Sequence, residues 1–290
     1  MHQQVLVPYD ASQEAKRALK YALEVYPERD VVLLHVVEPS SDGVGPGGFS
    51  VTHYERVLEN AQSMLETAIE DFEDRNRIQT EVVFGRPTHE ILRQIEQRNV
   101  SHVVMGNRGR DGAARLLLGS VAETVVRRSP VPVTVVRTTD EEEFEPPERV
   151  LVPFDASAQS RKALRYALGR FTDADVTALY VLYPSESIPT GMPDHEGTFG
   201  ILEDWDESRD EHAREVLEAA EELATEFDRS VDTTHVEGRP EDAIVEYVEE
   251  DGIEHVVIGS TGRDGLGRLV LGSVAETVVR RSPVSVTVPK

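Results

Sequence analysis

The chain alternates short apolar runs with longer segments in which apolar residues recur every three or four positions. The short runs are typical of buried strands, and the recurring pattern is typical of helices that bury one face. In the first half we expect strands at 4–8, 31–37, 79–84, 101–105 and 131–136, and helices at 12–26, 52–75, 87–98 and 121–128. Strands that alternate with helices predict an α/β fold: a parallel sheet with right-handed crossovers and helices on both faces.

The same order of elements returns in the second half. Residues 5–12, VLVPYDAS, recur as 150–157, VLVPFDAS, which is a shift of 145. The sequence GSVAETVVRRSPV at 119–131 recurs letter for letter at 272–284, which is a shift of 153. Two homologous domains therefore follow one another along the chain. The difference, 153 − 145, gives eight extra residues in the second domain, and we expect them in a loop at 183–204.

The segment between the repeats, RTTDEEEFEPPER at 137–149, is acidic and contains two prolines. This composition predicts an extended linker. We expect the first domain at 1–138, the acidic linker at 139–148 and the second domain at 149–290.

Composition excludes several classes of function. The 54 acidic and 30 basic residues give a formal net charge of −24, which argues against nucleic acid as the main partner because phosphate backbones need lysine and arginine. The chain contains no cysteine, so thiol catalysis and cysteine-ligated zinc are excluded. The apolar runs are too short to span a membrane, and the first residues lack the pattern of a signal peptide. We expect a cytoplasmic protein that binds no membrane.

The basic residues are unusual, because only four of the 30 are lysine. A chain this acidic and this poor in lysine fits a halophile, whose multimolar salt screens self-repulsion over a few ångströms. The alternative is an ordinary acidic protein from a GC-rich genome.

Three segments are expected to meet where the strands end, because ligands of such sheets bind beyond the carboxyl ends of the strands. In the first, Asp10 follows strand one and could accept ribose hydroxyls, although Asp10 or Ser12 could instead cap the next helix. In the second, Gly106 and Gly109 could present backbone amides to an anion, although such a pair also occurs in plain turns.

The third segment begins the helix at 121–128. Ser120 with Glu123 three residues later predicts a capping box, with Ser120 as the cap. The positive end of this helix would stabilise a phosphate. The alternative is a well-capped helix with a structural role alone.

The glycines form the pattern Gly-x2-Gly-x9-Gly-Ser, at Gly106, Gly109, Gly119 and Ser120, and the pattern repeats at Gly259, Gly262, Gly272 and Ser273. Together with the aspartate after strand one, this pattern resembles the tandem proteins of the universal stress protein (UspA) family, in their ATP-binding form. The resemblance implies two Rossmann-like domains, each with a five-stranded parallel sheet of order 3-2-1-4-5. It also implies an intramolecular pseudo-dimer in which the last strands of the two halves pair antiparallel.

The resemblance also implies roles for individual residues. The ribose would be held by Asp10 and Asp155, the adenine edge would be read by backbone groups of Val36 and Val181, and the phosphates would lie on the glycine loop and the following helix. The expected nucleotide-binding residues are Pro8, Tyr9, Asp10, Ala11, Val36, Met105, Gly106, Arg108, Gly109, Gly119, Ser120 and Val121, with Pro153, Phe154, Asp155, Ala156, Val181, Ile258, Gly259, Thr261, Gly262, Gly272, Ser273 and Val274 in the second domain. Asn107 departs from the serine that is usual there and present at Ser260, and His35 is replaced by Tyr180.

Other patterns are interpreted as structural. The glycines at 43–48 resemble a dinucleotide motif, but they include a proline and have no counterpart in the second half, so we expect a flexible loop. His102 and His255 occupy equivalent positions just before the fourth strand and are expected to be structural. Trp205 has no assigned role. The chain has no P-loop and no HExxH motif, and we expect no metal bound by protein side chains, although Mg²⁺ could accompany the nucleotide.

The expected function is that of an ATP-binding stress-response or regulatory protein with two sites and little or no turnover. One alternative is a slow ATPase or a protein that phosphorylates itself on Ser120 and Ser273. Another is a structural dimer module that binds no nucleotide. Self-association of whole chains is also compatible with the sequence.

Overall fold

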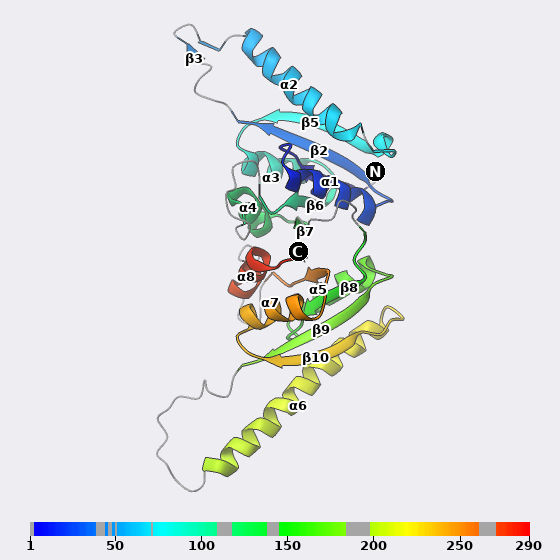
Figure 1. Ribbon diagram of the computed structural model, residues 1–290, viewed down its shortest axis with the longest axis vertical. Helices are drawn as coiled ribbons and strands as arrows, with labels where there is room; N and C mark the ends of the chain where they lie inside the picture. Colours follow the sequence, from blue (N-terminus) through cyan, green and yellow to red (C-terminus); the bar gives the residue numbers. More distant parts are fainter. Residues whose placement is uncertain are drawn as a thin grey trace. The chain divides into compact units, whose positions relative to one another are not determined.

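The computed structural model describes residues 3–38, 44–45, 48–49, 51–70, 72–108, 118–137, 145–183, 198–260 and 271–290 (Figure 1). The chain divides into two compact units, Met1–Pro146 and Pro147–Pro289. Each unit is described by itself. The expected domain boundaries and the expected pairing of the two last strands stay predictions.

The first unit is built around five parallel strands. They are hydrogen-bonded in the order β5-β2-β1-β6-β7, so their order by position along the chain is third, second, first, fourth, fifth. The elements are β1 (Gln4–Pro8), α1 (Gln13–Val25), β2 (Asp30–Val37), β3 (Val44–Gly45), β4 (Gly48–Phe49), α2 (Val51–Ile69), the 3-10 turn η2 (Arg75–Arg77), β5 (Ile78–Phe84), α3 (Pro87–Gln97), β6 (Val100–Gly106), α4 (Ser120–Arg128) and β7 (Val133–Val136).

The second unit repeats this arrangement with parallel pairings in the order β10-β9-β8-β11-β12. Its elements are β8 (Arg149–Pro153), α5 (Ala158–Arg170), β9 (Asp175–Leu182), α6 (Thr198–Thr225), β10 (Asp232–Glu237), α7 (Pro240–Glu250), β11 (His255–Val257), α8 (Ser273–Arg281) and β12 (Ser285–Val288). The expected alternation of helices with a parallel sheet is therefore confirmed in both units.

Helices cover both faces of each sheet. Contacts between α3 and α4, between α5 and α6, and between α7 and α8 show which helices share a face, as right-handed crossovers require. The first strand of each unit is completely buried: Val5–Val7 in β1 and Val150–Val152 in β8 have no exposed surface. A strand covered on both faces needs apolar residues at successive positions, and this explains the continuous apolar runs in the sequence. None of the described helices combines the length and the apolar character that a membrane span requires.

Three boundary predictions were wrong. The helix expected at 52–75 ends at Ile69, where 3-10-type hydrogen bonds replace the helical ladder, and a separate turn follows at Arg75–Arg77. The loop expected at 183–204 is shorter, because α6 already begins at Thr198 and extends the helical pattern towards the N-terminus. The loop expected at 43–48 contains the antiparallel pair β3 and β4, whose two-residue strands are too short to give a periodic pattern.

One arginine in each unit holds the end of the first helix. The Arg77 guanidinium donates to the carbonyls of Leu23, Tyr26 and Arg29 at 3.0–3.4 Å. Arg229 donates in the same way to the carbonyls of Leu168, Phe171 and Ala174. Leu23 and Leu168 lie in the last helical turn, whose carbonyls have no partner within the helix, and the arginines give these carbonyls a charged donor. The other carbonyls of each set belong to the C-cap residue and to the residue just before the second strand. The two arginines also connect the segment just before the third strand of each unit, β5 or β10, to the end of the first helix.

A buried histidine lies in the fourth strand of each unit, within β6 or β11 and not before it as expected. The Nε2 atom of His102 lies 2.8 Å from Thr134 Oγ1, and that of His255 lies 2.9 Å from Thr287 Oγ1. Both rings are 1% exposed, and each packs on an aromatic ring, Tyr26 or Phe171. The interpretation of the two histidines as structural agrees with this packing.

We predict that Arg77→Ala and Arg229→Ala each destabilise their own unit by about 2–3 kcal/mol, because three carbonyls at a helix end lose a charged donor. Urea unfolding followed by hydrogen exchange of peptides from each unit measures the effect. Arg75→Ala and Arg214→Ala are matched controls, since both side chains are exposed. Equal stability of Arg77→Ala and Arg75→Ala would show that the hydrogen bonds of Arg77 to the three carbonyls contribute nothing to stability.

We also predict an acid-labile second unit. Burial lowers the pKa of His255 to about 3 from 6.5, so the unfolded chain binds a proton that the folded chain does not. Stability is therefore complete above pH 6.5 and falls as the pH drops towards 3, by up to about 1.4 kcal/mol per pH unit. His255→Gln should flatten this slope in hydrogen-exchange measurements on β8 and β11, whereas His212→Gln, which replaces a 45% exposed side chain, should not. An unchanged slope in His255→Gln would contradict the prediction.

Candidate functional site

The first strand of each unit ends in a strained turn. Ala11 and Ala156 have φ of 65° and 59°, in the left-handed region that residues other than glycine rarely adopt. A side chain held there costs on the order of 1 kcal/mol or more, and such strain is concentrated at functional sites. The strain occurs at equivalent positions in both units, directly after the aspartate singled out in the sequence.

Hydrogen bonds hold this turn in shape. Asp10 Oδ1 accepts from the backbone N–H of Ser12 at 3.0 Å and from its hydroxyl at 2.5 Å. Ser12 Oγ in turn accepts from the N–H of Ala15 at 3.1 Å, so Ser12 is the residue that caps α1. In the second unit Asp155 Oδ1 accepts from the N–H of Ser157 at 3.0 Å, and Ser157 caps α5. The aspartate thus shapes the turn, and the serine has the capping role that was left open.

The aromatic residue before each aspartate points into the core. Tyr9 and Phe154 are 4% and 2% exposed, so these residues can line a site mainly through their backbone. Burial raises the pKa of Tyr9, and the charge of Asp10 raises it further. His35 reaches the same turn, with Nδ1 2.7 Å from the Tyr9 carbonyl oxygen. Its counterpart Tyr180 packs edge-on against His212 instead.

The second strand extends beyond the end of the first, and its register determines which way the backbone N–H and C=O groups of Val36 point. Tyr9 N–H donates to Leu34 O at 2.8 Å, so the backbone groups of Leu34 face β1. Gly85 N–H donates to Val37 O at 3.0 Å, so the backbone groups of Val37 face β5. Because successive residues of a strand alternate in direction, Val36 faces the β1 side, where β1 has already ended at Pro8.

The second unit has the same register. Phe154 N–H donates to Leu179 O at 2.8 Å and Gly238 N–H donates to Leu182 O at 2.9 Å, so Val181 faces the end of β8. In both units a backbone donor and acceptor of one residue therefore lie beside the aspartate turn. This pair can hydrogen-bond the edge of a planar heterocycle.

The glycine that ends the fourth strand has a packing role of its own. A Cβ on Gly106 would lie 2.6 Å from Glu14 Cβ and 2.9 Å from the Glu14 carbonyl carbon. On Gly259 it would lie 2.9 Å from the carbonyl carbon of Gln159. Backbone atoms at this distance cannot move aside cheaply, so the absence of a side chain lets the end of β6 and the segment just after β11 lie against the first turn of α1 or α5.

Asn107 joins three elements at the end of β6. Its N–H donates to Val136 O at 3.2 Å, and its carbonyl accepts from Gly119 N–H at 2.7 Å, which ties β7 and the start of α4 together. The side chain is 2% exposed, and its Oδ1 has no hydrogen-bond partner in the described part of the chain. An unsatisfied buried carbonyl costs about 1–3 kcal/mol, so this oxygen is suited to a donor from a ligand or a water molecule.

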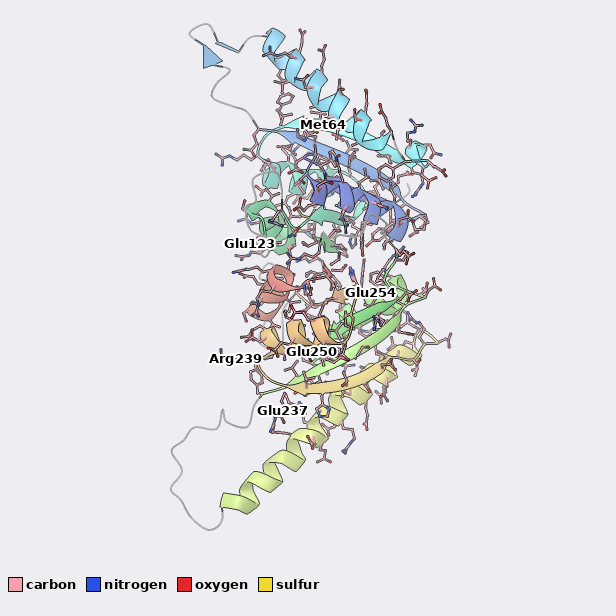
Figure 2. All side chains as sticks on the ribbon, viewed as in Figure 1. Met64, Glu123, Glu237, Arg239, Glu250 and Glu254 are labelled. Carbon is pink, nitrogen blue, oxygen red and sulfur yellow. The ribbon has the colours of Figure 1, made fainter. Side chains whose placement is uncertain are left out.

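The capping box expected at Ser120 was wrong. Gly119 is the N-cap, with φ −68° and ψ 149°, and Ser120 is the first helical residue. Glu123 (labelled in Figure 2) therefore lies one position too far along to reach back, and it accepts from Arg127 at 3.1 Å. The start of α8 is the same, with Gly272 as N-cap and no side-chain cap. The first-turn amides of both helices are thus left to other partners, as an anion site requires.

Two arginines lie at the carboxyl ends of neighbouring strands in the first unit. Arg108 Nη2 is 3.6 Å from Glu14 Oε1. Arg137 directly follows β7, and burial lowers its pKa to about 10, with a further lowering from the charge of Arg108. The sequence analysis grouped Arg137 with the acidic segment at 137–149, gave it no role in the site, and passed over Glu14. Aligning the repeats could have revealed both, since the counterpart of Arg137 is the basic Lys290 and that of Glu14 is Gln159.

The structure thus brings most of the expected residues to one end of each sheet. Met105 and Ile258 are buried in the same stretch, at 4% exposed each, and Ser120 and Ser273 are exposed at the starts of their helices. Gly109, Thr261 and Gly262 lie outside the described residues. Within the described part of the chain, no cluster of three or more histidine, aspartate or glutamate residues could hold a metal ion.

Comparison with known proteins agrees with this fold. The chain is 29% identical to a universal stress protein from Mycolicibacterium smegmatis, over 99% of this chain and 97% of that protein. One half is 33% identical to a universal stress protein from Methanocaldococcus jannaschii, over 49% of this chain and 82% of that protein.

Solved structures and family models give the same result. The crystal structure of a universal stress protein from Archaeoglobus fulgidus is 27% identical, with a TM-score of 0.69, and the match covers 99% of this chain and 98% of that one. The model of the universal stress protein family matches residues 1–137 and again residues 147–290. Both halves of the chain are covered, and the chain therefore belongs to the universal stress protein family.

Proposed function

We propose that each unit binds an adenine nucleotide at the carboxyl ends of its strands and turns it over slowly or not at all. The observation that carries this proposal is the backbone arrangement repeated in both units. A residue of the second strand, Val36 or Val181, faces the strained turn that holds Asp10 or Asp155. A helix start without a side-chain cap follows the glycine that ends the fourth strand.

The three parts of a nucleotide fit these groups in order. The Val36 backbone offers one donor and one acceptor to the adenine edge, and Asp10 offers a carboxylate to the ribose hydroxyls. The phosphates would lie on the first-turn amides of α4 and near Arg108, where the positive end of the helix stabilises negative charge. The second unit would use Val181, Asp155 and α8 in the same way. Mg²⁺ would be held by the phosphates, since the described side chains offer it no cluster.

Slow or absent turnover is supported by the carboxylates at this end of the first unit. Asp10 accepts two hydrogen bonds from Ser12, Glu14 is paired with Arg108, and Glu123 is paired with Arg127. Each of these described carboxylates is already engaged, and hydrolysis that used a described carboxylate would need one of them to orient and deprotonate water. The rival function, self-phosphorylation, is favoured by Ser120 and Ser273, which are exposed first residues of their helices and do not cap them. Calorimetric titration with ATP tests binding, and phosphate release with Mg²⁺ tests turnover.

The cellular setting is proposed on composition. A stress-response or regulatory role is supported by the family to which the chain belongs, and a salt-rich cytoplasm is supported by the net charge of −24 and by the scarcity of lysine.

We predict that Asp10→Ala and Asp155→Ala each weaken nucleotide binding at one site by about ten- to 150-fold, because a charge-assisted hydrogen bond to the ribose is lost. Calorimetry on each single variant should then show one strong and one weak site. Ser12→Ala is the matched control. It removes the cap of α1 and lowers stability by about 1 kcal/mol, but it leaves the carboxylate in place, and its affinity should change less than threefold. Unchanged affinity in the double variant of Asp10 and Asp155 would remove the aspartates from the site.

A further inference from the structure

Two positions beside the proposed phosphate region differ together between the units. Glu14 of the first unit corresponds to Gln159, by the shift of 145, and Arg108 corresponds to Thr261, by the shift of 153. The first unit therefore has a carboxylate and a guanidinium where the second has an amide and a hydroxyl residue. The summed charge of the two positions is zero in both units, but its distribution differs.

The structure explains why these positions are coupled. Gly106, at the end of β6, and Gly259, just after β11, bring the chain against residue 14 or 159 in the first turn of the first helix of each unit, α1 or α5. In the first unit this contact places Arg108 Nη2 3.6 Å from Glu14 Oε1. In the second unit Gln159 Oε1 lies 3.5 Å from the Ser260 hydroxyl, which donates to it. The same junction is thus bridged by charges in one unit and by neutral groups in the other.

The charges of the first unit are poorly exposed. The side chain of Arg108 is 13% exposed and that of Glu14 is 19% exposed, so water and salt screen them less than they screen a surface pair. A phosphate beside Arg108 is attracted by the guanidinium and repelled by the carboxylate behind it. Glu14 also competes with the phosphate for the hydrogen-bond donors of Arg108. Both effects grow with the negative charge of the ligand.

We propose that Glu14 is a specificity-determining residue of the first site. Through its pair with Arg108, it reduces the affinity for nucleoside triphosphates more than the affinity for monophosphates. The second site has neither charge at these positions and distinguishes the same ligands less. This proposal rests on the proposed function, since it concerns the same nucleotide site.

The test uses the full chain with Asp155→Ala, so that the second site is weakened and the first site is measured as the stronger of the two. AMP and ATP are titrated calorimetrically into this parent, into Glu14→Gln, into Arg108→Thr and into the double variant, at two salt concentrations. Glu14→Gln should raise the affinity for ATP about tenfold and that for AMP less than threefold, and the gain for ATP should shrink at high salt. Arg108→Thr should lower the affinity for ATP about tenfold. In the double variant, Glu14→Gln should raise the ATP affinity by less than it does alone, because the effects of coupled residues are not additive.

The second unit supplies the reciprocal control. In a chain whose first site is weakened by Asp10→Ala, Gln159→Glu adds a carboxylate at a junction that has no arginine equivalent to Arg108. It should lower the affinity for ATP about tenfold and change the affinity for AMP less than threefold. Thermal unfolding checks that each variant is folded, and Glu14→Ala, which also removes the carboxylate, replaces Glu14→Gln if that variant is not.

The outcomes separate the two proposals. If the parent binds neither AMP nor ATP, the proposed function fails and this inference fails with it. If the parent binds both, but Glu14→Gln leaves the ratio of the two affinities unchanged, the inference alone is overturned. The inference is established if Glu14→Gln raises the ratio of ATP affinity to AMP affinity at the first site and Gln159→Glu lowers that ratio at the second.

Discussion

The position at which the buried first strand ends controls the geometry of each unit. β1 and β8 are flanked by parallel strands and covered by helices, and they have no exposed surface in their centre. The chain has to leave this strand abruptly, while the neighbouring second strand continues for three more residues. The left-handed residue Ala11 or Ala156 makes the exit possible, and the backbone of Val36 or Val181 then faces the space that the first strand has left. The candidate site is a consequence of this difference in strand length.

Several residues of the glycine and aspartate motifs serve the fold and the site together. Asp10 holds the turn through Ser12, and Gly106 lets the fourth strand end against the first helix. Such residues would be needed for folding even if no ligand were bound. The motif is therefore evidence for the turn. The proposed nucleotide binding depends instead on the backbone of Val36 and on the start of α4, which face the site beside this turn.

The two units share this backbone and differ in the side chains around it. Asn107, Arg108 and Glu14 stand where the second unit has Ser260, Thr261 and Gln159. The ion pair of Glu14 with Arg108 and the buried Asn107 carbonyl belong to the first unit, whereas the described part of the second unit joins Gln159 to Ser260 by a neutral hydrogen bond. Under the proposed function, two sites with the same backbone would differ in the ligands that they favour, because side chains would contact the phosphates while the backbone would contact the heterocycle.

The sequence by itself determined the repeat, the alternation of strands and helices, and the end of the sheet at which the motifs gather, because apolar periodicity and parallel topology follow from local pattern. It also indicated Asp10 and the glycines, since their residue types are the ones that a tight turn after a strand requires. Tertiary structure alone decided that Gly119 and not Ser120 caps α4, because a cap depends on backbone angles that several residue types can adopt. It alone brought Glu14 to Arg108, because contacts between residues some 90 positions apart depend on how α1 packs against the end of β6. It also left Asn107 Oδ1 buried with no partner among the residues that the structure describes.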